Sequence, residues 1–375
     1  MTKDKTHILI VITSPLAFGG IEQYVLGLIN SILQHKEKFC VSLLSPYECT
    51  NVSYKENLKN MKVPLYEFNL KFDPGRGAKH LTRTTAKFFK QHSNFDVVHV
   101  HSSSKIAMAK LAYIAKRMLN AKVILHSHCS IDQNGFIKKL IRLFCSFSIN
   151  RNADYLCACS KIAAETQFTK GVQDKVIICN NGVDTSKFKL NKDTNLKLRK
   201  QLNIKKDELV IGNVARFCYQ KNQTFLVDVF REIIKQHKNS KLLFIGEGED
   251  LENIKKKVKE YKITNKVIFL HKITDIQNYM QVIDVFVMPS IFEGLPIAAI
   301  EAQAAGLPLI LSDSISEETK IIKEVKFLSL NDTPENWAYN ILDYKNFTKK
   351  NNSKIIKEAG FTIPDTYDRV LKMYA

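Results

Sequence analysis

Residues 285–306 read VFVMPSIFEGLPIAAIEAQAAG, which is an apolar strand-like run, then a turn, then a helix rich in Ala and Ile. Pro296 fits the first turn of that helix, where the missing N–H of proline costs nothing and its fixed φ helps. Gly306 fits the position after the last turn. The pattern predicts a strand–loop–helix unit, with Glu293 on the loop just before the helix and Glu301 about two turns inside it.

The two glutamates of this unit are the first candidates for chemistry. A helix N-terminus presents free N–H groups and a partial positive charge, so it attracts phosphate. Glu301 is the only charge in a helix otherwise made of Ala, Ile, Gln and Leu. A buried carboxylate there needs a hydrogen-bonding partner, such as a sugar diol of a nucleotide. The simpler alternative is that Glu293 is a helix-start acid favoured by the dipole and that Glu301 points to solvent.

The eight-residue spacing of Glu293 and Glu301, with Glu-Gly-Leu-Pro between strand and helix, resembles the E-x7-E motif of GT-B glycosyltransferases. More narrowly, it resembles family 4, retaining enzymes that use nucleotide sugars. The resemblance implies that Glu293 lies against the donor sugar and that Glu301 hydrogen-bonds the ribose hydroxyls. It also implies that the helix start and the loop cradle the donor, which adds Gly294, Leu295 and Pro296 to the site. The resemblance covers nearly the whole chain and is to bacterial capsule and exopolysaccharide transferases.

Length and composition indicate a two-domain globular protein. A chain of 375 residues is too long for one ordinary core, and 45% hydrophobic residues is a normal content. The apolar run at residues 8–12 is far below signal-peptide or membrane-spanning length and predicts a strand. Eight Cys occur without a C-x-x-C pair or paired His/Cys metal spacing, which is typical of reduced, buried cysteines. We therefore expect a cytoplasmic protein with no metal or other cofactor.

The net charge of +19 favours anionic partners. Residues 1–185 carry 25 Lys or Arg against 13 Asp or Glu, and the remainder carries 31 against 24. Residues 76–91 and 136–149 combine basic residues with Phe, Ile and Leu at helical spacing, which fits a peripheral helix on an anionic membrane. The same spacing also fits a helix whose apolar stripe faces its own core. No recognised nucleic-acid motif occurs, so no nucleic-acid partner is expected.

Strand-like runs alternate with helical patterns through the first half of the chain, which predicts a doubly wound parallel α/β domain. The runs lie at residues 7–12, 40–45, 63–68, 97–101, 122–126, 154–159 and 176–179. Ligands of such sheets bind outside the carboxyl ends of the strands. The pair Gly19-Gly20 follows the first run, where glycine lets the backbone approach a ligand, although the pair could simply shape the turn. The resemblance places Gly19 and Gly20 beside donor and acceptor.

Two histidine pairs fall at strand ends, His99-Val-His101 and His126-Ser-His128. No carboxylate or Cys accompanies them to complete a metal site, so structural, hydrogen-bonded roles are favoured for His99 and His126. The resemblance places His128 in the cleft near the reacting sugar and makes it the candidate catalytic histidine. The next residue is Cys129, where many relatives have Asp or Asn.

The second half of the chain predicts a second domain of the same class. The Lys-rich stretch 185–207 predicts a linker with an opening helix, which gives domains of residues 1–185 and 186–360, with a C-terminal helix at 361–375 that rejoins the first. Arg216 and Lys221 follow a strand-like run and could converge on one diphosphate. The resemblance assigns them to the donor diphosphate, and Gly246 to close approach of backbone and nucleotide. Family members usually have Gly where Ala215 stands.

The sequence therefore predicts two Rossmann-like domains that transfer a hexosyl unit from a nucleotide sugar, expected to be UDP-linked, to a glycan acceptor, expected to be linked to a polyprenyl diphosphate. No D-x-D occurs, so Arg216, Lys221 and the helix start are expected to neutralise the leaving diphosphate without a metal. Three alternatives stay open: a GT-B sugar-nucleotide epimerase, a basic nucleic-acid-binding protein, and a catalytically silent partner in glycan assembly.

Overall fold

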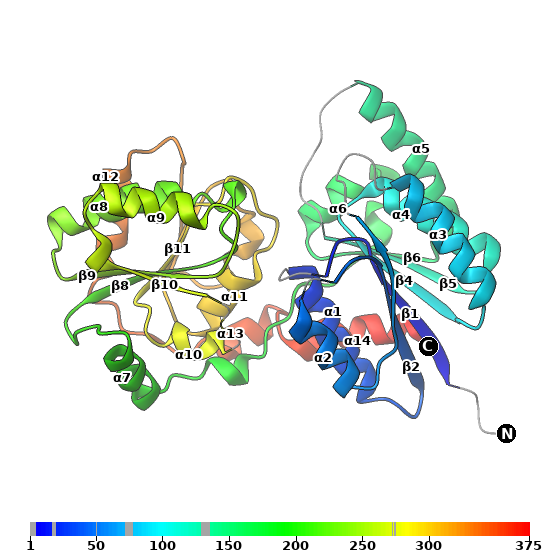
Figure 1. The fold of residues 1–375 in the computed structure, drawn as a ribbon, viewed down its shortest axis with the longest axis horizontal. Coiled ribbons are helices and arrows are strands. Elements are labelled where there is room, and N and C mark those ends of the chain that lie inside the picture. Colours follow the sequence, from blue (N-terminus) through cyan, green and yellow to red (C-terminus); the bar gives the residue numbers. More distant parts are fainter. Residues whose placement is uncertain are drawn as a thin grey trace. The chain divides into compact units, whose positions relative to one another are not determined.

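The computed structural model describes residues 5–16, 20–49, 51–71, 78–128, 136–271, 273 and 275–375, with no side-chain description for residues 78–80, 136–140 and 142. The chain folds into two compact units (Figure 1). Unit 1 comprises Met1–Gly182 and Ile363–Ala375, and unit 2 comprises Val183–Thr362. The chain thus passes from unit 1 to unit 2 after Gly182, three residues before the expected boundary after residue 185, and it returns to unit 1 at Ile363.

Unit 1 is built on a seven-stranded parallel sheet in the order β3-β2-β1-β4-β5-β6-β7. Its strands are β1 (Thr6–Ile12), β2 (Phe39–Tyr47), β3 (Leu65–Leu70), β4 (Val97–Ser102), β5 (Lys122–Ser127), β6 (Tyr155–Ala158) and β7 (Val176–Ile178). The order reverses between β1 and β4, so the carboxyl ends of these two strands flank the switch point where such sheets bind ligands. The predicted doubly wound α/β class is confirmed.

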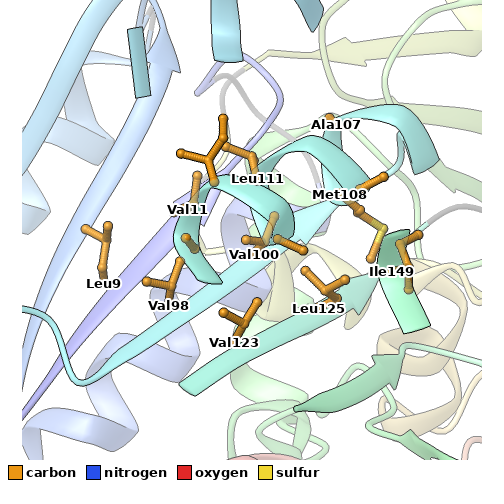
Figure 2. Close-up of a cluster of buried hydrophobic side chains, with 14 of the residues drawn as sticks. Leu9, Val11, Val98, Val100, Ala107, Met108, Leu111, Val123, Leu125 and Ile149 are labelled. Atoms are coloured by element: carbon orange, nitrogen blue, oxygen red, sulfur yellow. The ribbon is translucent and has the colours of Figure 1, made fainter. Parts of the chain in front are cut away.

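Helices cover both faces of this sheet, which is why its central strands are continuous apolar runs. They are α1 (Gly20–Leu33), α2 (Val52–Asn60), α3 (Ala78–Gln91), α4 (Lys105–Met118), α5 (Phe136–Asn152), α6 (Lys161–Gln167) and α14 (Ile363–Tyr374). Figure 2 shows the core on one face, where Val100 and Leu125 of the strands meet Met108 and Leu111 of α4 and Ile149 of α5. The core on the other face is packed by α1, α2 and α14.

The C-terminal helix α14 is bound to unit 1 by specific contacts. The Tyr367 hydroxyl donates to the Tyr24 carbonyl of α1 at 3.0 Å, and the Thr366 hydroxyl donates to the Asn180 carbonyl at 2.8 Å. A Cβ on Gly27 would lie 2.2 Å from the Tyr367 hydroxyl oxygen, so glycine is required where α1 meets this ring. The end of the chain therefore completes the core of unit 1.

Unit 2 is a six-stranded parallel sheet in the order β10-β9-β8-β11-β12-β13. Its strands are β8 (Leu209–Val214), β9 (Ser240–Ile245), β10 (Val267–Leu270), β11 (Val285–Met288), β12 (Leu309–Ser312) and β13 (Val325–Leu328). Its helices are α7 (Lys192–Gln201), α8 (Gln223–Gln236), α9 (Leu251–Glu260), α10 (Ile276–Met280), α11 (Ile297–Ala304), α12 (Pro334–Leu342) and α13 (Ser353–Glu358). No strand was predicted at β13, because an edge strand of four residues that includes Lys326 has no clear apolar pattern.

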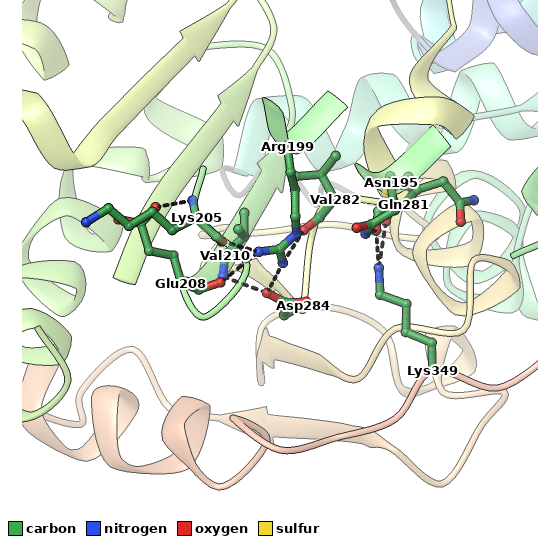
Figure 3. Close-up of polar contacts among 10 residues, drawn as sticks. Asn195, Arg199, Lys205, Glu208, Val210, Gln281, Val282, Asp284 and Lys349 are labelled. Atoms are coloured by element: carbon green, nitrogen blue, oxygen red, sulfur yellow. Dashed lines mark hydrogen bonds and ion pairs between the residues drawn. The ribbon is translucent and has the colours of Figure 1, made fainter. Parts of the chain in front are cut away.

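The Lys-rich stretch before β8 was predicted to hold a linker and an opening helix, and the helix is present as α7, an integral part of unit 2. Arg199 of α7 is 8% exposed. Its guanidinium pairs with the Asp284 carboxylate at 2.8 Å and donates to the carbonyls of Lys205, Glu208 and Val282 (Figure 3). Asp284 also accepts the Val210 amide at 2.8 Å, so this ion pair fixes α7 to the starts of β8 and β11.

Replacing Arg199 by alanine is expected to cost unit 2 about 3 kcal/mol, because the partly buried Asp284 carboxylate and several carbonyls lose their partner. Lys200→Ala is the matched control, because this neighbouring side chain is exposed. Its effect should stay within about 0.5 kcal/mol. Denaturant titration followed by the fluorescence of Trp337, the single Trp of the chain and a residue of unit 2, measures both. Equal effects of the two variants would contradict the assignment.

The structure also bears on the expectations for membrane-spanning segments and for cysteines. Within the described ranges, no helix is long and apolar enough to cross a membrane. Seven of the eight Cys lie in the described part of the chain and all seven are free, whereas Cys129 lies outside it.

Candidate functional site

The strand–loop–helix unit predicted from residues 285–306 is present in unit 2 as β11, a loop and α11. The helix begins one residue later than expected, with Pro296 as its N-cap and Ile297 as its first residue. Glu301 is therefore the fifth helical residue, little more than one turn inside, and the expected depth of two turns was wrong. Gly306 has φ of 77°, and a Cβ there would lie 2.1 Å from the Lys350 carbonyl oxygen, so only glycine fits this helix end.

The loop before α11 is held by two neighbouring segments. The Ile291 amide donates to the Gln220 carbonyl at 2.8 Å, and the Gln220 side-chain amide donates to the Phe292 carbonyl at 2.9 Å. On its other side, the Ser316 amide donates to the Glu293 carbonyl at 3.3 Å. These bonds fix the backbone of Glu293 and connect it to the loop that follows β8, so the two predicted halves of the donor site form one structure.

Lys221 and Glu293 form a shielded ion pair. The Lys221 ammonium contacts Glu293 Oε1, and the two side chains are 18% and 11% exposed. Shielding strengthens the attraction, and losing one partner would strand the other charge in a poorly solvated position. The sequence placed both residues in the site but not in contact with each other. The structure brings them together across 72 residues of chain.

Arg216 lies on the same β8 loop but in a different environment. Its guanidinium donates to Glu249 Oε2 at 2.9 Å, and both side chains are well exposed. Such a pair contributes little free energy and is easily exchanged for another anion. The backbone of Arg216 is nevertheless fixed, because the Gln223 side-chain amide donates to its carbonyl at 2.9 Å. The result is an available cation on an anchored loop.

Glu301 is the carboxylate of this site whose protonation the protein changes most. Its side chain is partly buried, and no hydrogen bond to it forms within the described part of the chain. Burial raises the pKa of Glu301 to about 7, and Lys187 partly offsets that rise. A carboxylate held in this state gains from any ligand that offers hydroxyl donors, because hydrogen bonds to the charged form replace its lost hydration.

Gly246 at the end of β9 is needed for packing within the protein. Its φ is 149°, and a Cβ would lie 2.1 Å from the Ala215 carbonyl oxygen. Gly248 is similar, since a Cβ there would lie 2.1 Å from the Phe217 carbonyl oxygen. The two glycines let the loop after β9 lie directly on the loop that carries Arg216. The packing accounts for Gly246 in full, and direct approach to a nucleotide stays a prediction.

The predicted site residues of unit 1 lie at the carboxyl ends of its strands. Gly20 is the first residue of α1 and is exposed, whereas Gly19 and Cys129 lie outside the described residues. His128 follows β5 directly, and its amide donates to the Ser102 carbonyl at the end of β4 at 3.1 Å. His128 is partly exposed. Desolvation nevertheless lowers the pKa of His128 to about 3, so the ring is neutral at physiological pH.

The four histidines of β4 and β5 form one cluster, which we call the histidine stack: His99, His101, His126 and His128. His126 and His128 are 4.5 Å apart at 12°, and His101 and His126 are 4.9 Å apart at 29°. The His101 Nδ1 and His128 Nε2 atoms are 3.0 Å apart, and His99 Nδ1 lies 2.6 Å from the Tyr374 hydroxyl. The hydrogen-bonded role expected for His99 is therefore correct. For His126 it was wrong, because neither ring nitrogen has a partner in the described structure.

The ring nitrogens of His99, His101 and His126 come within 4.8 Å of one another. His126 is stacked on His99 and on His101, with ring planes 18° and 29° apart, whereas His99 is tilted 39° from His101. Lone pairs lie in the ring planes, so the stacked pairs do not aim theirs at one shared point, as ligands of a single ion must. The stack thus fits neutral, buried rings better than a metal centre.

Two further residues contact the predicted site residues. Gln220 bridges the two loops of unit 2, and a lone Gln in a basic loop has no motif to mark it. Tyr24 of α1 packs edge-on against His126 and His128, at 4.9 and 5.3 Å between ring centroids.

Two α/β units, with a basic loop and two glutamates on the loop–helix unit of the second, are the arrangement expected of a nucleotide-sugar-dependent glycosyltransferase. Sequence comparison agrees: residues 18–187 match the family described as Glycosyltransferase Family 4, and residues 194–359 match Glycosyl transferases group 1. EpsF of Bacillus subtilis (strain 168), which is named as a glycosyltransferase, is 30% identical over 332 residues, covering 86% of this chain and 84% of its own. The chain belongs to the family 4 glycosyltransferases of GT-B fold.

Other relatives indicate the range of the family. The UDP-Gal:alpha-D-GlcNAc-diphosphoundecaprenol alpha-1,3-galactosyltransferase of Escherichia coli is 26% identical over 348 residues, covering 88% of this chain and 82% of its own. The crystal structure of Anabaena HepE in complex with UDP and glucose has a TM-score of 0.78, with 98% of both chains covered and 16% identity. At that identity the structural likeness shows the fold alone.

Proposed function

We propose that this protein transfers a hexosyl unit from a UDP-hexose to a glycan acceptor carried on a polyprenyl diphosphate, with retention of anomeric configuration, in the synthesis of a capsule or exopolysaccharide. The observation that carries the proposal is Glu301. It is a partly buried carboxylate without a hydrogen bond in the described chain, on the same loop–helix unit as the Lys221–Glu293 pair. The two hydroxyls of a ribose supply the donors that this carboxylate lacks.

The leaving group is the first chemical problem of such a transfer, because negative charge grows on the nucleoside diphosphate as its bond to the sugar breaks. Arg216 can exchange its exposed partner Glu249 for a phosphate, and Lys221 lies on the same loop. The N–H groups at the start of α11 add a partial positive charge. Fixed positive groups stabilise developing charge without reorganisation, so we propose that the reaction needs no metal.

The same exchange gives Glu293 its role. In the ligand-free structure Lys221 neutralises Glu293. A bound diphosphate competes for the Lys221 ammonium, and the Glu293 carboxylate then becomes available to accept hydrogen bonds from the donor sugar. Gly294, Leu295 and Pro296 form the remainder of this loop. His128 of unit 1, neutral at physiological pH, is proposed to line the reacting face of the sugar.

The names of two relatives support the proposed acceptor and cellular site. The Escherichia coli relative acts, by its name, on a sugar linked to diphosphoundecaprenol. Another relative is named as an amylovoran biosynthesis glycosyltransferase, from Erwinia amylovora. We infer a comparable lipid-linked acceptor here, which would be reached at the inner face of the plasma membrane.

Thermal unfolding without added metal, with EDTA present, tests the donor site. A ligand bound only by the folded state at 100 times its Kd stabilises by about 2.7 kcal/mol. We expect that gain with UDP and one UDP-hexose, and we expect its loss in Lys221→Ala and Arg216→Ala but not in Lys256→Ala, which removes an exposed charge of α9. No gain with any nucleotide, together with a gain from DNA, would overturn the donor site and favour the nucleic-acid alternative.

Product analysis tests the reaction itself. The stabilising UDP-hexose is incubated with an undecaprenyl-diphosphate-linked sugar, and the anomeric proton of the product is followed by NMR. Transfer with the configuration of the donor supports the proposal. Binding without transfer to this acceptor or to a soluble oligosaccharide contradicts it and favours a silent partner, whereas conversion of the UDP-hexose to its epimer shows the epimerase alternative.

A further inference from the structure

The helices on one face of unit 1 have an unusual charge content. Helices α3, α4 and α5 each contain four Lys or Arg and no Asp or Glu. They are consecutive neighbours, with α4 packed between α3 and α5, and Figure 1 shows them on the same side of the seven-stranded sheet. We call this set the basic layer. The basic layer thus holds 12 of the 25 Lys and Arg of residues 1–185. Lys116 of α4 pairs with Asp154 at 2.8 Å, and a surface with this excess of positive charge favours an anionic partner.

Helix α5 adds an exposed apolar surface to the basic layer. Its buried side packs Ser146 and Ile149 against the core, yet Phe144 and Phe147 are 77% and 68% exposed. Ile141 and Leu143 are exposed on the same helix. In the described part of the chain, Phe144 and Phe147 are the only exposed Phe side chains. Apolar side chains gathered in this way mark an interaction site, whereas single exposed ones need no explanation.

The structure distinguishes residues 76–91 from residues 136–149, although the composition of both fitted either a membrane helix or a core-facing helix. In α3, Leu81, Phe88 and Phe89 are all buried, while Arg83, Lys87 and Lys90 are exposed at a spacing that places them on one face. This helix uses its apolar stripe for the core and presents charge only. In α5, Phe144 and Phe147 are exposed although Ile149 is buried, and the N-terminal end of the helix extends beyond the other helices of the layer (Figure 1).

We propose that the basic layer docks on an anionic bilayer, with Phe144 and Phe147 inserted among the headgroups and the exposed side chains of Arg83, Lys87 and Lys90 on lipid phosphates. Charge complementarity selects this occupant, because each basic group near an anionic leaflet is attracted to it and exposed Phe, Leu and Ile gain from the acyl boundary. A nucleic acid would use the basic groups and aromatic rings but gain nothing from Ile141 and Leu143. Tyr113 and Ile106 on α4 are also exposed and extend the apolar surface. This inference deepens the proposed lipid-linked acceptor, which requires the enzyme at the membrane.

Vesicle co-sedimentation of the full chain tests the proposal. At about 0.1 M salt we expect binding to phosphatidylglycerol–phosphatidylcholine vesicles and little binding to phosphatidylcholine alone. Phe144→Ser with Phe147→Ser should weaken the binding roughly tenfold or more. Reversing Arg83, Lys87 and Lys90 to Glu should weaken it at least as much, since six units of charge are changed. The matched control reverses Lys206, Lys256 and Lys259 of unit 2, which are exposed as well. That control should retain most of the binding.

Two further measurements, of Trp emission and of the UDP-hexose thermal shift, complete the test. Phe147→Trp is a conservative variant, and its emission should shift to the blue with anionic vesicles. An unchanged spectrum, absent binding to anionic vesicles, or equal weakening by the unit 2 control overturns the proposal, as does tighter binding to RNA than to vesicles. The UDP-hexose thermal shift is measured on the same variants. If it is intact while vesicle binding is lost, membrane docking is separate from donor binding, so failure of either proposal is recognised independently.

Discussion

Lowering the pH from 7.5 to 5 is expected to cost unit 1 several kcal/mol of unfolding free energy, because the histidine stack must stay neutral to stay folded. Burial lowers the pKa of His99 and of His128 to about 3, and burial with the neighbouring rings lowers the pKa of His101 and His126 well below the usual value. In the unfolded chain each ring titrates near pH 6.5.

The sign of the effect follows from which state binds more protons. Below about pH 6.5 the unfolded chain takes up protons that the folded stack refuses, so stability falls steadily as the pH drops toward 3. At pH 5 each ring that stays neutral contributes a loss of about 2 kcal/mol. Several such rings approach the whole stability of an ordinary domain, about 5–15 kcal/mol.

Amide hydrogen exchange in β4 and β5 measures this loss in unit 1, while Trp337 fluorescence follows unit 2 separately. His126→Leu removes a ring whose nitrogens have no partner in the described structure, so it should hardly change the unfolding free energy at pH 7.5. Because one titrating ring is lost, the number of protons taken up on unfolding at pH 5 should fall by about one. His35→Leu is the control, since that side chain is 42% exposed and lies outside the histidine stack. Protection in β4 and β5 that is the same at both pH values, after correction for intrinsic exchange, would refute the prediction.

Replacing Glu301 by glutamine is expected to stabilise the ligand-free protein and to weaken donor binding at the same time. The raised pKa, about 7 against 4.5, means that the folded protein disfavours the charged carboxylate. The stability cost is absent below pH 4.5, grows as the pH rises to 7, and is complete at pH 8, where it is up to about 3 kcal/mol. Glu301→Gln should recover much of that free energy in unit 2 at pH 8 and little at pH 4.5.

Donor affinity should change in the opposite direction. A hydrogen bond to a charged acceptor contributes about 1.5–3 kcal/mol, so the neutral amide is expected to weaken UDP-hexose binding roughly ten- to hundredfold. Glu252→Gln on α9 is the control, because its carboxylate is 81% exposed and should change neither quantity. Denaturant titration and calorimetric UDP titration at pH 8 measure the two effects. Unchanged affinity in Glu301→Gln would remove Glu301 from the proposed site.

The sequence alone determined the fold class and the arrangement of the main elements. Period-two and period-3.6 apolar patterns arise from local backbone geometry, and the Gly and Pro signals around residues 285–306 are local as well. These features fixed β11, its loop and α11 to within a residue, and the spacing of Glu293 and Glu301 indicated the family. The edge strand β13 was not predicted, because four residues are too few to show a period.

Tertiary structure decided everything that depends on contacts between distant segments. Only the folded chain joins Lys221 to Glu293, pairs Arg199 of the predicted opening helix with Asp284, and packs Gly246 against the Ala215 carbonyl. Composition could not separate α3 from α5, since both are basic and amphipathic. Whether an apolar stripe meets a core or solvent is set by the neighbouring elements, and here Phe88 is buried while Phe144 is exposed. Burial, and with it the pKa of Glu301 and of the histidine stack, exists only in the folded protein.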